Sequence, residues 1–112
     1  MPETKTLQLM APIEHHGQTL THVALREPSG GLYARLGDPR VAVRTKEGGY
    51  WVEQPEIIKS YLDKLIDHQD GAVLLGLMSM PDVMMLKEEL FGFFAAAEGT
   101  IIARRAAGSS ST

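Results

Sequence analysis

The stretch from Ser79 to Ala97 constrains the fold most, because its apolar residues recur at steps of three and four. This spacing places them on one side of an α-helix with 3.6 residues per turn. The side expected to face the core comprises Val83, Leu86, Leu90, Phe93, Phe94 and Ala97. Ser79 is placed to cap the start, and Gly99 offers an end. We therefore predict a core helix over residues 80–97.

A second apolar group lies beside this core face. Met80, Met84 and Phe91 flank it, and Met85 lies further round the helix. Flexible thioether side chains suit surfaces that accommodate a variable partner, although methionine fills gaps in cores about as often. The combined apolar surface is wider than docking onto a small domain requires. We expect part of it to contact a partner protein or a second copy of the chain.

The segments before this helix alternate strand and helix patterns. Period-two alternation predicts an antiparallel hairpin over residues 6–26 and a second over residues 41–52, the latter carrying the aromatic pair Tyr50 and Trp51. A capped short helix is predicted at residues 30–36, and an amphipathic helix at residues 55–68. Tyr50 and Trp51 are the next place to expect a partner surface if the methionine flank is not one.

These patterns together predict an α+β fold, with N-terminal antiparallel β-hairpins packed against a C-terminal helical hairpin. The expected domain covers residues 1–99 of the 112-residue chain. Residues 100–112 begin with an apolar pair and end in small polar residues, so we expect a tail that is at least partly disordered.

Composition narrows the classes of function. A net charge of −3 lacks the basic footprint that would bind nucleic acid, and the absence of cysteine excludes disulfides and thiolate metal sites. No apolar run approaches the ~20 residues of a membrane helix. The N-terminus lacks the layout of a signal peptide, so we expect the chain to stay in the cytoplasm where it is made.

The histidines are the obvious candidates for chemistry, because imidazole titrates near neutral pH and binds transition metals. His15 and His16 fall in a predicted exposed turn, and no carboxylate or further histidine recurs at ligand spacing. We therefore expect no metal, no cofactor, no small-molecule substrate and no catalytic residue. The less favoured alternative is a small metal-dependent enzyme that uses Glu14, His15 and His22.

Several short motifs occur along the chain in a distinctive order: Pro12-Ile13, Gly17, Leu25-Arg26-Glu27-Pro28, Asp82, Leu86 and the pair Phe93-Phe94. Their order and spacing resemble the small tail assembly chaperones of contractile-tailed phages and of Mu-like or P2-like prophages. The resemblance covers residues 7–37 and 56–97, and it departs at residues 38–54, where a plainer connection or more helix is expected.

This resemblance implies a non-enzymatic protein of the host bacterial cytoplasm that acts in phage tail morphogenesis. Its partner would be the long, helical, aggregation-prone tape measure protein, held while tail tube subunits polymerise around it. The resemblance also implies that the protein is absent from the finished virion; self-association remains possible through the apolar flank of the last helix. A structural component of the tail or baseplate, or another small protein-interaction module, remains the alternative.

Overall fold

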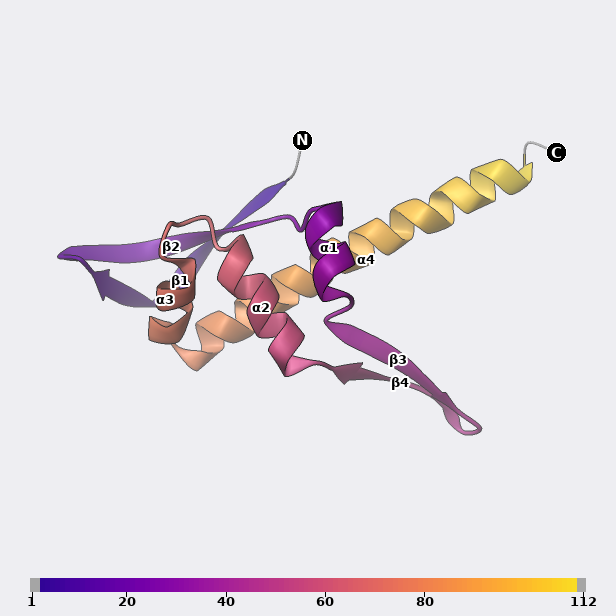
Figure 1. Cartoon of the computed structure of the whole chain (residues 1–112), viewed down its shortest axis with the longest axis horizontal. Coiled ribbons are helices and arrows are strands. Elements are labelled where there is room, and N and C mark those ends of the chain that lie inside the picture. The colour runs from indigo at the N-terminus through magenta and orange to yellow at the C-terminus, as the bar shows by residue number, and fades with distance from the viewer. Residues whose placement is uncertain (1–2, 111–112) are drawn as a thin grey trace.

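The longest element of the computed structural model is α4 (Met80–Ser110), which begins beside α3 and runs along most of the long axis of the molecule to one end (Figure 1). The structure describes residues 3–110. The other elements are, in chain order, β1 (Thr4–His15), β2 (Gln18–Arg26), α1 (Gly30–Leu36), β3 (Arg40–Thr45), β4 (Gly48–Glu53), α2 (Pro55–Leu65) and α3 (Gly71–Leu77). Two antiparallel hairpins and a set of C-terminal helices confirm the predicted α+β class.

The first hairpin pairs β1 with β2 around a two-residue turn. His16 and Gly17 form this turn with φ values of 50° and 75°, and positive φ at both positions is the mark of the type I′ turn that suits twisted strands. Pairing is regular from Thr4 to Gln8, breaks, and resumes at Ile13. The break lies around Pro12, which has no N–H to donate to a ladder.

A buried carboxylate fastens this break to the start of α4. Asp82 is 1% exposed, and its Oδ1 accepts the Met10 N–H at 2.7 Å while its Oδ2 accepts the Ala11 N–H at 3.1 Å. The Ser79 hydroxyl donates to Oδ2 as well, at 2.8 Å. Burial alone would raise the pKa of Asp82, but these three hydrogen bonds outweigh it and lower the pKa below the ordinary 3.8.

One core joins the first hairpin to α2, α3 and the first half of α4. The predicted core face of α4 supplies Leu86, Leu90 and Phe93, while Ala97 is exposed. The buried apolar residues from all elements are Leu9, Ile13, Val23, Leu25, Ile58, Tyr61, Leu62, Leu65, Ile66, Leu74, Leu86, Leu90, Phe91 and Phe93. Removing large side chains from such a core typically costs several kcal/mol, so these residues hold the elements together.

The predicted helix at residues 55–68 is too long, because α2 ends at Leu65. Ile66 forms an antiparallel bridge with Leu25, and the Asp67 N–H donates to the Ala24 carbonyl at 2.8 Å. The chain leaves the helix there because its backbone pairs with the edge of β2.

The predicted end of the last helix at Gly99 is also wrong, since α4 continues to Ser110. Alanine and arginine, both strong helix formers, dominate residues 103–107, and this run offsets the ~1 kcal/mol that one glycine costs. The Thr100 hydroxyl also donates to the Ala96 carbonyl one turn earlier. The predicted tail at residues 100–112 is therefore helical as far as Ser110, and residues 111–112 lie outside the described chain.

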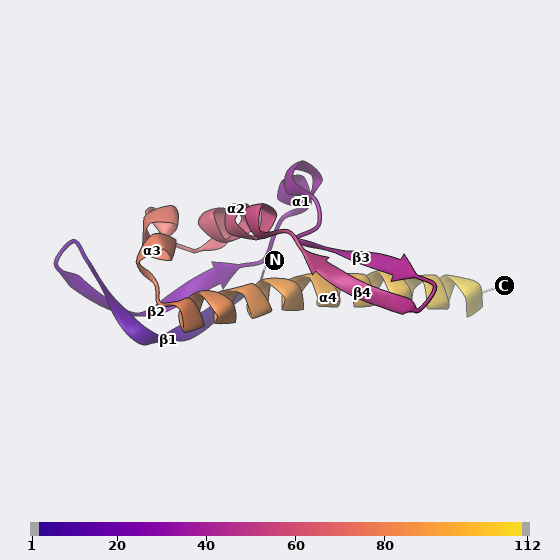
Figure 2. The same cartoon turned by 90° about the horizontal axis from the view of Figure 1, so that it is seen from below.

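Two arms extend from the core. One is residues 95–106 of α4, here called the helical arm, in which every residue is exposed. The other is the β3–β4 hairpin, here called the hairpin arm, which forms a sheet of its own. Figure 1 shows the arms diverging from a common base near α1, and Figure 2 shows them from a second side. Among the described residues, even the 31-residue α4 lacks the apolar character needed to cross a membrane.

Candidate partner-binding surface

A groove with a mostly apolar lining lies at the base of the helical arm. It has a volume of about 330 Å³ and lies between α1, the segment before it, and the middle of α4. We call it the α1–α4 groove. Its lining residues are Glu27, Pro28, Ser29, Gly30, Tyr33, Asp38, Phe93, Phe94, Ala97, Glu98 and Ile101.

The wall formed by α1 is set by local sequence. The Ser29 hydroxyl accepts the Leu32 N–H at 3.1 Å, as an N-cap should, so α1 begins where its sequence predicts. Gly37 ends the helix with a φ of 80°, and its N–H donates to the Tyr33 carbonyl. The Gly37 carbonyl in turn accepts the Tyr61 hydroxyl at 2.6 Å, which fixes α1 to α2. The groove therefore has one rigid side.

Aromatic packing fixes the floor of the groove. Phe94 of α4 contacts two tyrosine rings, with centroids 5.7 Å from Tyr33 and 5.5 Å from Tyr61. Burial is the main cause that raises the pKa of Tyr61 to about 12, so this hydroxyl stays protonated and donates at every physiological pH. A hydrogen bond from Tyr33 to Asp38, at 3.1 Å, raises the pKa of Tyr33 as well.

The charges around the groove have one sign. Glu27, Asp38 and Glu98 line an otherwise mostly apolar surface that continues along α4 to Ile101. Phe94, Ala97 and Ile101 are three and four residues apart and so share one helix face. A helix with an apolar stripe and flanking basic residues complements this arrangement in both shape and charge.

The hairpin arm carries the predicted aromatic pair on its surface. Tyr50 is 55% exposed and Trp51 is 53% exposed. The Arg40 guanidinium lies between Trp51 and Phe91, with its central carbon 4.4 Å and 4.6 Å from the two ring centroids. Stacking of this kind contributes about 0.5–2 kcal/mol, so it orients Trp51 against α4.

An ion pair fastens the same end of the arm. Lys87 of α4 donates to both carboxylate oxygens of Glu53, at 3.1 Å and 3.4 Å. The far end of the arm, at residues 46–49, is exposed. The arm is therefore held at its base and presented to solvent along its length.

The expectation that Phe91 belongs to an exposed flank is wrong. Phe91 is 6% exposed and is part of the core. Its predicted place beside the core face is right for an isolated helix, but the base of the hairpin arm folds over it and Arg40 covers its ring. Phe91 therefore supports the hairpin arm and is not available to a partner.

The methionines divide between surface and interior. Met80 is 74% exposed and Met84 is 52% exposed, whereas Met85 is half-buried. Leu77, at the end of α3 and three residues before Met80, is 52% exposed. Met80 and Met84 are one helical turn apart and so share a face of α4. These two side chains are open to contact, as the sequence predicts.

The residues of the alternative metal site do not come together. Glu14 accepts a hydrogen bond from the Thr19 hydroxyl, and His22 bonds to Thr21 on β2. His15 instead approaches His16 and Asp70, the latter 55 residues further along the chain. Sequence spacing could not reveal this group, because the loop between α2 and α3 carries Asp70 to the hairpin tip.

The helical arm, with its exposed Ile101 and Ile102, was not predicted from the sequence. Their side chains are 50% and 66% exposed. The signal was present in the spacing of Phe94, Ala97 and Ile101, which continues the helical period through Gly99. Placing the end of the helix at Gly99 hid this continuation.

Comparison with known proteins identifies no relative of this chain. No protein-family model, no curated protein and no solved structure matches the chain. The function is therefore inferred from the chain's own surface and from the sequence resemblance described above.

Proposed function

We propose that this protein is a tail assembly chaperone that holds a helical segment of a phage tape measure protein. The observation that carries the proposal is the pair of apolar, exposed arms around the α1–α4 groove. Soluble proteins rarely leave such large side chains grouped on extended elements unless another molecule covers them. The sequence resemblance supplies the identity of that molecule.

The chemistry of the surface favours a helical partner. An apolar helix face lies well in a groove between two elements, with anchors three and four residues apart. The groove is lined by Phe94, Ala97 and Ile101, and its carboxylates favour basic residues beside the apolar stripe of the partner. Trp51 on the hairpin arm offers a second, aromatic contact of the type that dominates interface energies.

The proposal is tested by co-expressing the untagged chain with an affinity-tagged tape measure protein and measuring what is retained. Replacing Ile101 and Ile102 together with serine should leave the fold intact, because both are exposed, and should weaken retention at least tenfold. A tenfold change corresponds to about 1.4 kcal/mol, which is modest for two buried anchors. Val73→Ser in α3 is the matched control, since Val73 is 53% exposed and α3 lies toward the opposite end of the molecule from both arms (Figure 1).

Two further double variants locate the contact. Serine at Tyr50 and Trp51 tests the hairpin arm, and serine at Met80 and Met84 tests the methionine face. Retention of the tape measure protein by all three double variants at the level of Val73→Ser would contradict the proposal. Mass spectrometry of finished particles separates a chaperone, which should be absent, from a structural tail component, which should be present.

A further inference from the structure

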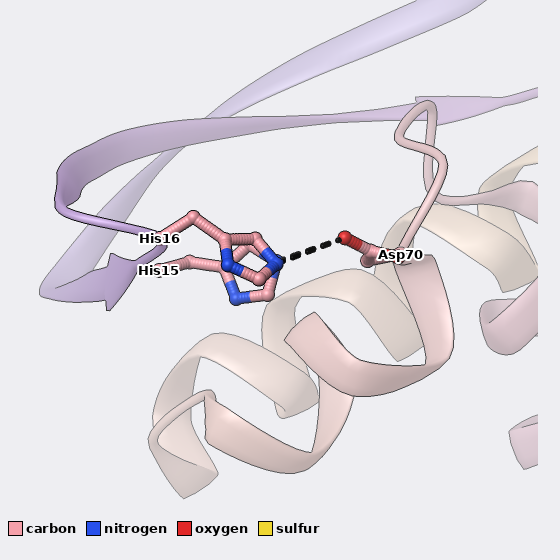
Figure 3. Close-up of side chains that lie close together, drawn as sticks. All are labelled: His15, His16 and Asp70. Carbon is pink, nitrogen blue, oxygen red and sulfur yellow. Dashed lines mark hydrogen bonds and ion pairs between the residues drawn. The ribbon is translucent and has the colours of Figure 1, made fainter.

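Two histidines and an aspartate from distant parts of the chain converge at the tip of the first hairpin. His15 ends β1, His16 is the first residue of the turn, and Asp70 precedes α3. One potential ligand atom from each residue lies within 4.8 Å of the other two. Figure 3 shows both imidazole rings directed at the same carboxylate.

The distances between these atoms are close to those between the ligands of one metal ion. His15 Nε2 lies 3.0 Å from Asp70 Oδ2, and His16 Nε2 lies 3.7 Å from the same oxygen. In a tetrahedral zinc site with bonds of about 2.0–2.1 Å, ligand atoms are about 3.3–3.4 Å apart. The two observed distances lie on either side of that separation, and the ligand atoms of His15 and His16 lie within 4.8 Å of each other.

The two imidazole rings contact the carboxylate differently. Neutral imidazole donates from one nitrogen and accepts at the other. His15 satisfies Asp70 with a hydrogen bond, while His16 directs a second nitrogen at the same carboxylate from 3.7 Å, beyond hydrogen-bond distance. A divalent cation among the three groups would accept one lone pair from each of them, in place of the hydrogen bond between His15 and Asp70. Imidazole and carboxylate together are a donor set typical of zinc.

Contacts with His68 hold the Asp70 backbone and the His15 ring in place. The Asp70 N–H donates to His68 Nδ1 at 2.9 Å, and the His68 ring packs edge-on against His15 with a centroid distance of 5.8 Å. His15 itself is shielded, with 12% of its side chain exposed. Two of the three ligands are therefore positioned by the fold, and His16 faces the solvent from which an ion would arrive.

We propose that His15, His16 and Asp70 form a zinc-class metal site that links the hairpin tip to the α2–α3 loop, with water completing the coordination. The site is separate from the partner-binding surface and does not depend on the proposed chaperone function. Because the ligands are 55 residues apart in the chain, an ion bound only by the folded state stabilises it by mass action.

The test uses the full untagged chain, freed of bound metal with a chelator that is then removed. Zn²⁺ binding is measured by isothermal titration calorimetry. We expect one ion per chain, a raised melting temperature that returns to its starting value on adding chelator, and visible absorption when Co²⁺ replaces zinc. Mg²⁺ should change none of these, because it prefers all-oxygen octahedral sites. Failure to bind Zn²⁺ at about one per chain overturns the proposal.

Variants separate a built site from general binding to surface histidines. His16→Asn removes a ligand yet suits the positive φ of this position, since asparagine tolerates that conformation. Asp70→Asn removes the charged ligand and leaves a residue type favoured at the N-cap position of α3. Each should weaken zinc binding at least tenfold, whereas His22→Asn, outside the cluster, should leave it unchanged. Equal binding by wild type, His16→Asn and Asp70→Asn would refute the site.

Discussion

The carboxylate of Asp82 offers the sharpest test of how the first hairpin is held to α4. It accepts hydrogen bonds from the Met10 and Ala11 N–H groups and from the Ser79 hydroxyl. Asp82→Asn keeps the size of the side chain but turns one acceptor oxygen into an NH₂ group that faces a backbone N–H. Hydrogen bonds to a charged group contribute about 1.5–3 kcal/mol each, so loss of one backbone bond and weakening of the other should cost about 2–4 kcal/mol.

The pH dependence identifies the charge as the cause. The folded-state pKa of Asp82 lies below its ordinary 3.8, so the unfolded chain binds more protons in the window below that value. The stabilisation is therefore complete at neutral pH and is lost as the pH falls through the folded-state pKa. The difference between wild type and Asp82→Asn should be full at pH 7 and clearly smaller at about pH 3.

Urea denaturation at both pH values measures this difference. Glu88→Gln is the matched control, because Glu88 is an exposed carboxylate of the same helix, and it should change the free energy of unfolding by less than ~0.5 kcal/mol. A loss below about 1 kcal/mol for Asp82→Asn at pH 7 would refute the reasoning, because that is the size of one ordinary neutral hydrogen bond. An equal loss at both pH values would show that the ionised carboxylate is not what holds the strand break.

Three further changes probe the core and the junctions. Leu90→Ala, at a fully buried position of α4, should cost about 2–5 kcal/mol in urea denaturation, and a loss under ~1 kcal/mol would place Leu90 outside the core. Gly71→Ala would put a Cβ 3.0 Å from the Asp63 carbonyl oxygen, so we expect a cost of about 1–3 kcal/mol and a lower melting temperature; an unchanged melt would mean the loop yields freely. Tyr61→Phe removes the hydrogen bond to Gly37, costing about 1 kcal/mol at pH 7. Because the pKa of Tyr61 is raised to about 12, wild-type stability should fall as pH rises above 10.0, and this alkaline loss should shrink in Tyr61→Phe.

Local patterns predicted the hairpins and α1 well. The predicted spans 6–26 and 41–52 correspond to strands that run from Thr4 to Arg26 and from Arg40 to Glu53, and α1 occupies residues 30–36 as expected. These elements depend on alternation, turn residues and a serine cap, which are all encoded within a few neighbouring positions.

The predictions for the end of α2 and for the exposure of Phe91 were wrong because segments distant in sequence determine both. Ile66 leaves its helix to bridge Leu25, and Phe91 is covered by Arg40 from the hairpin arm. Neither partner is visible in the sequence around the residue concerned. The meeting of His15 with Asp70 has the same origin, since a loop 55 residues away supplies the carboxylate. The wrongly predicted helix end at Gly99 has a local cause. The alanine-rich residues around Gly99 favour a helix more than a single glycine opposes it, and they are visible in the sequence.

The continuous α4 has a consequence for how the protein behaves in a column. The Cα radius of gyration of the whole protein is 16.6 Å and its extents are 60 × 36 × 25 Å. A compact domain of this length has a radius of gyration of about 13 Å. A monomer of this shape diffuses more slowly than a sphere of equal mass and elutes early from a size-exclusion column. Calibration against compact standards would overstate its mass, so light scattering or sedimentation equilibrium is the measurement that distinguishes an elongated monomer from a dimer.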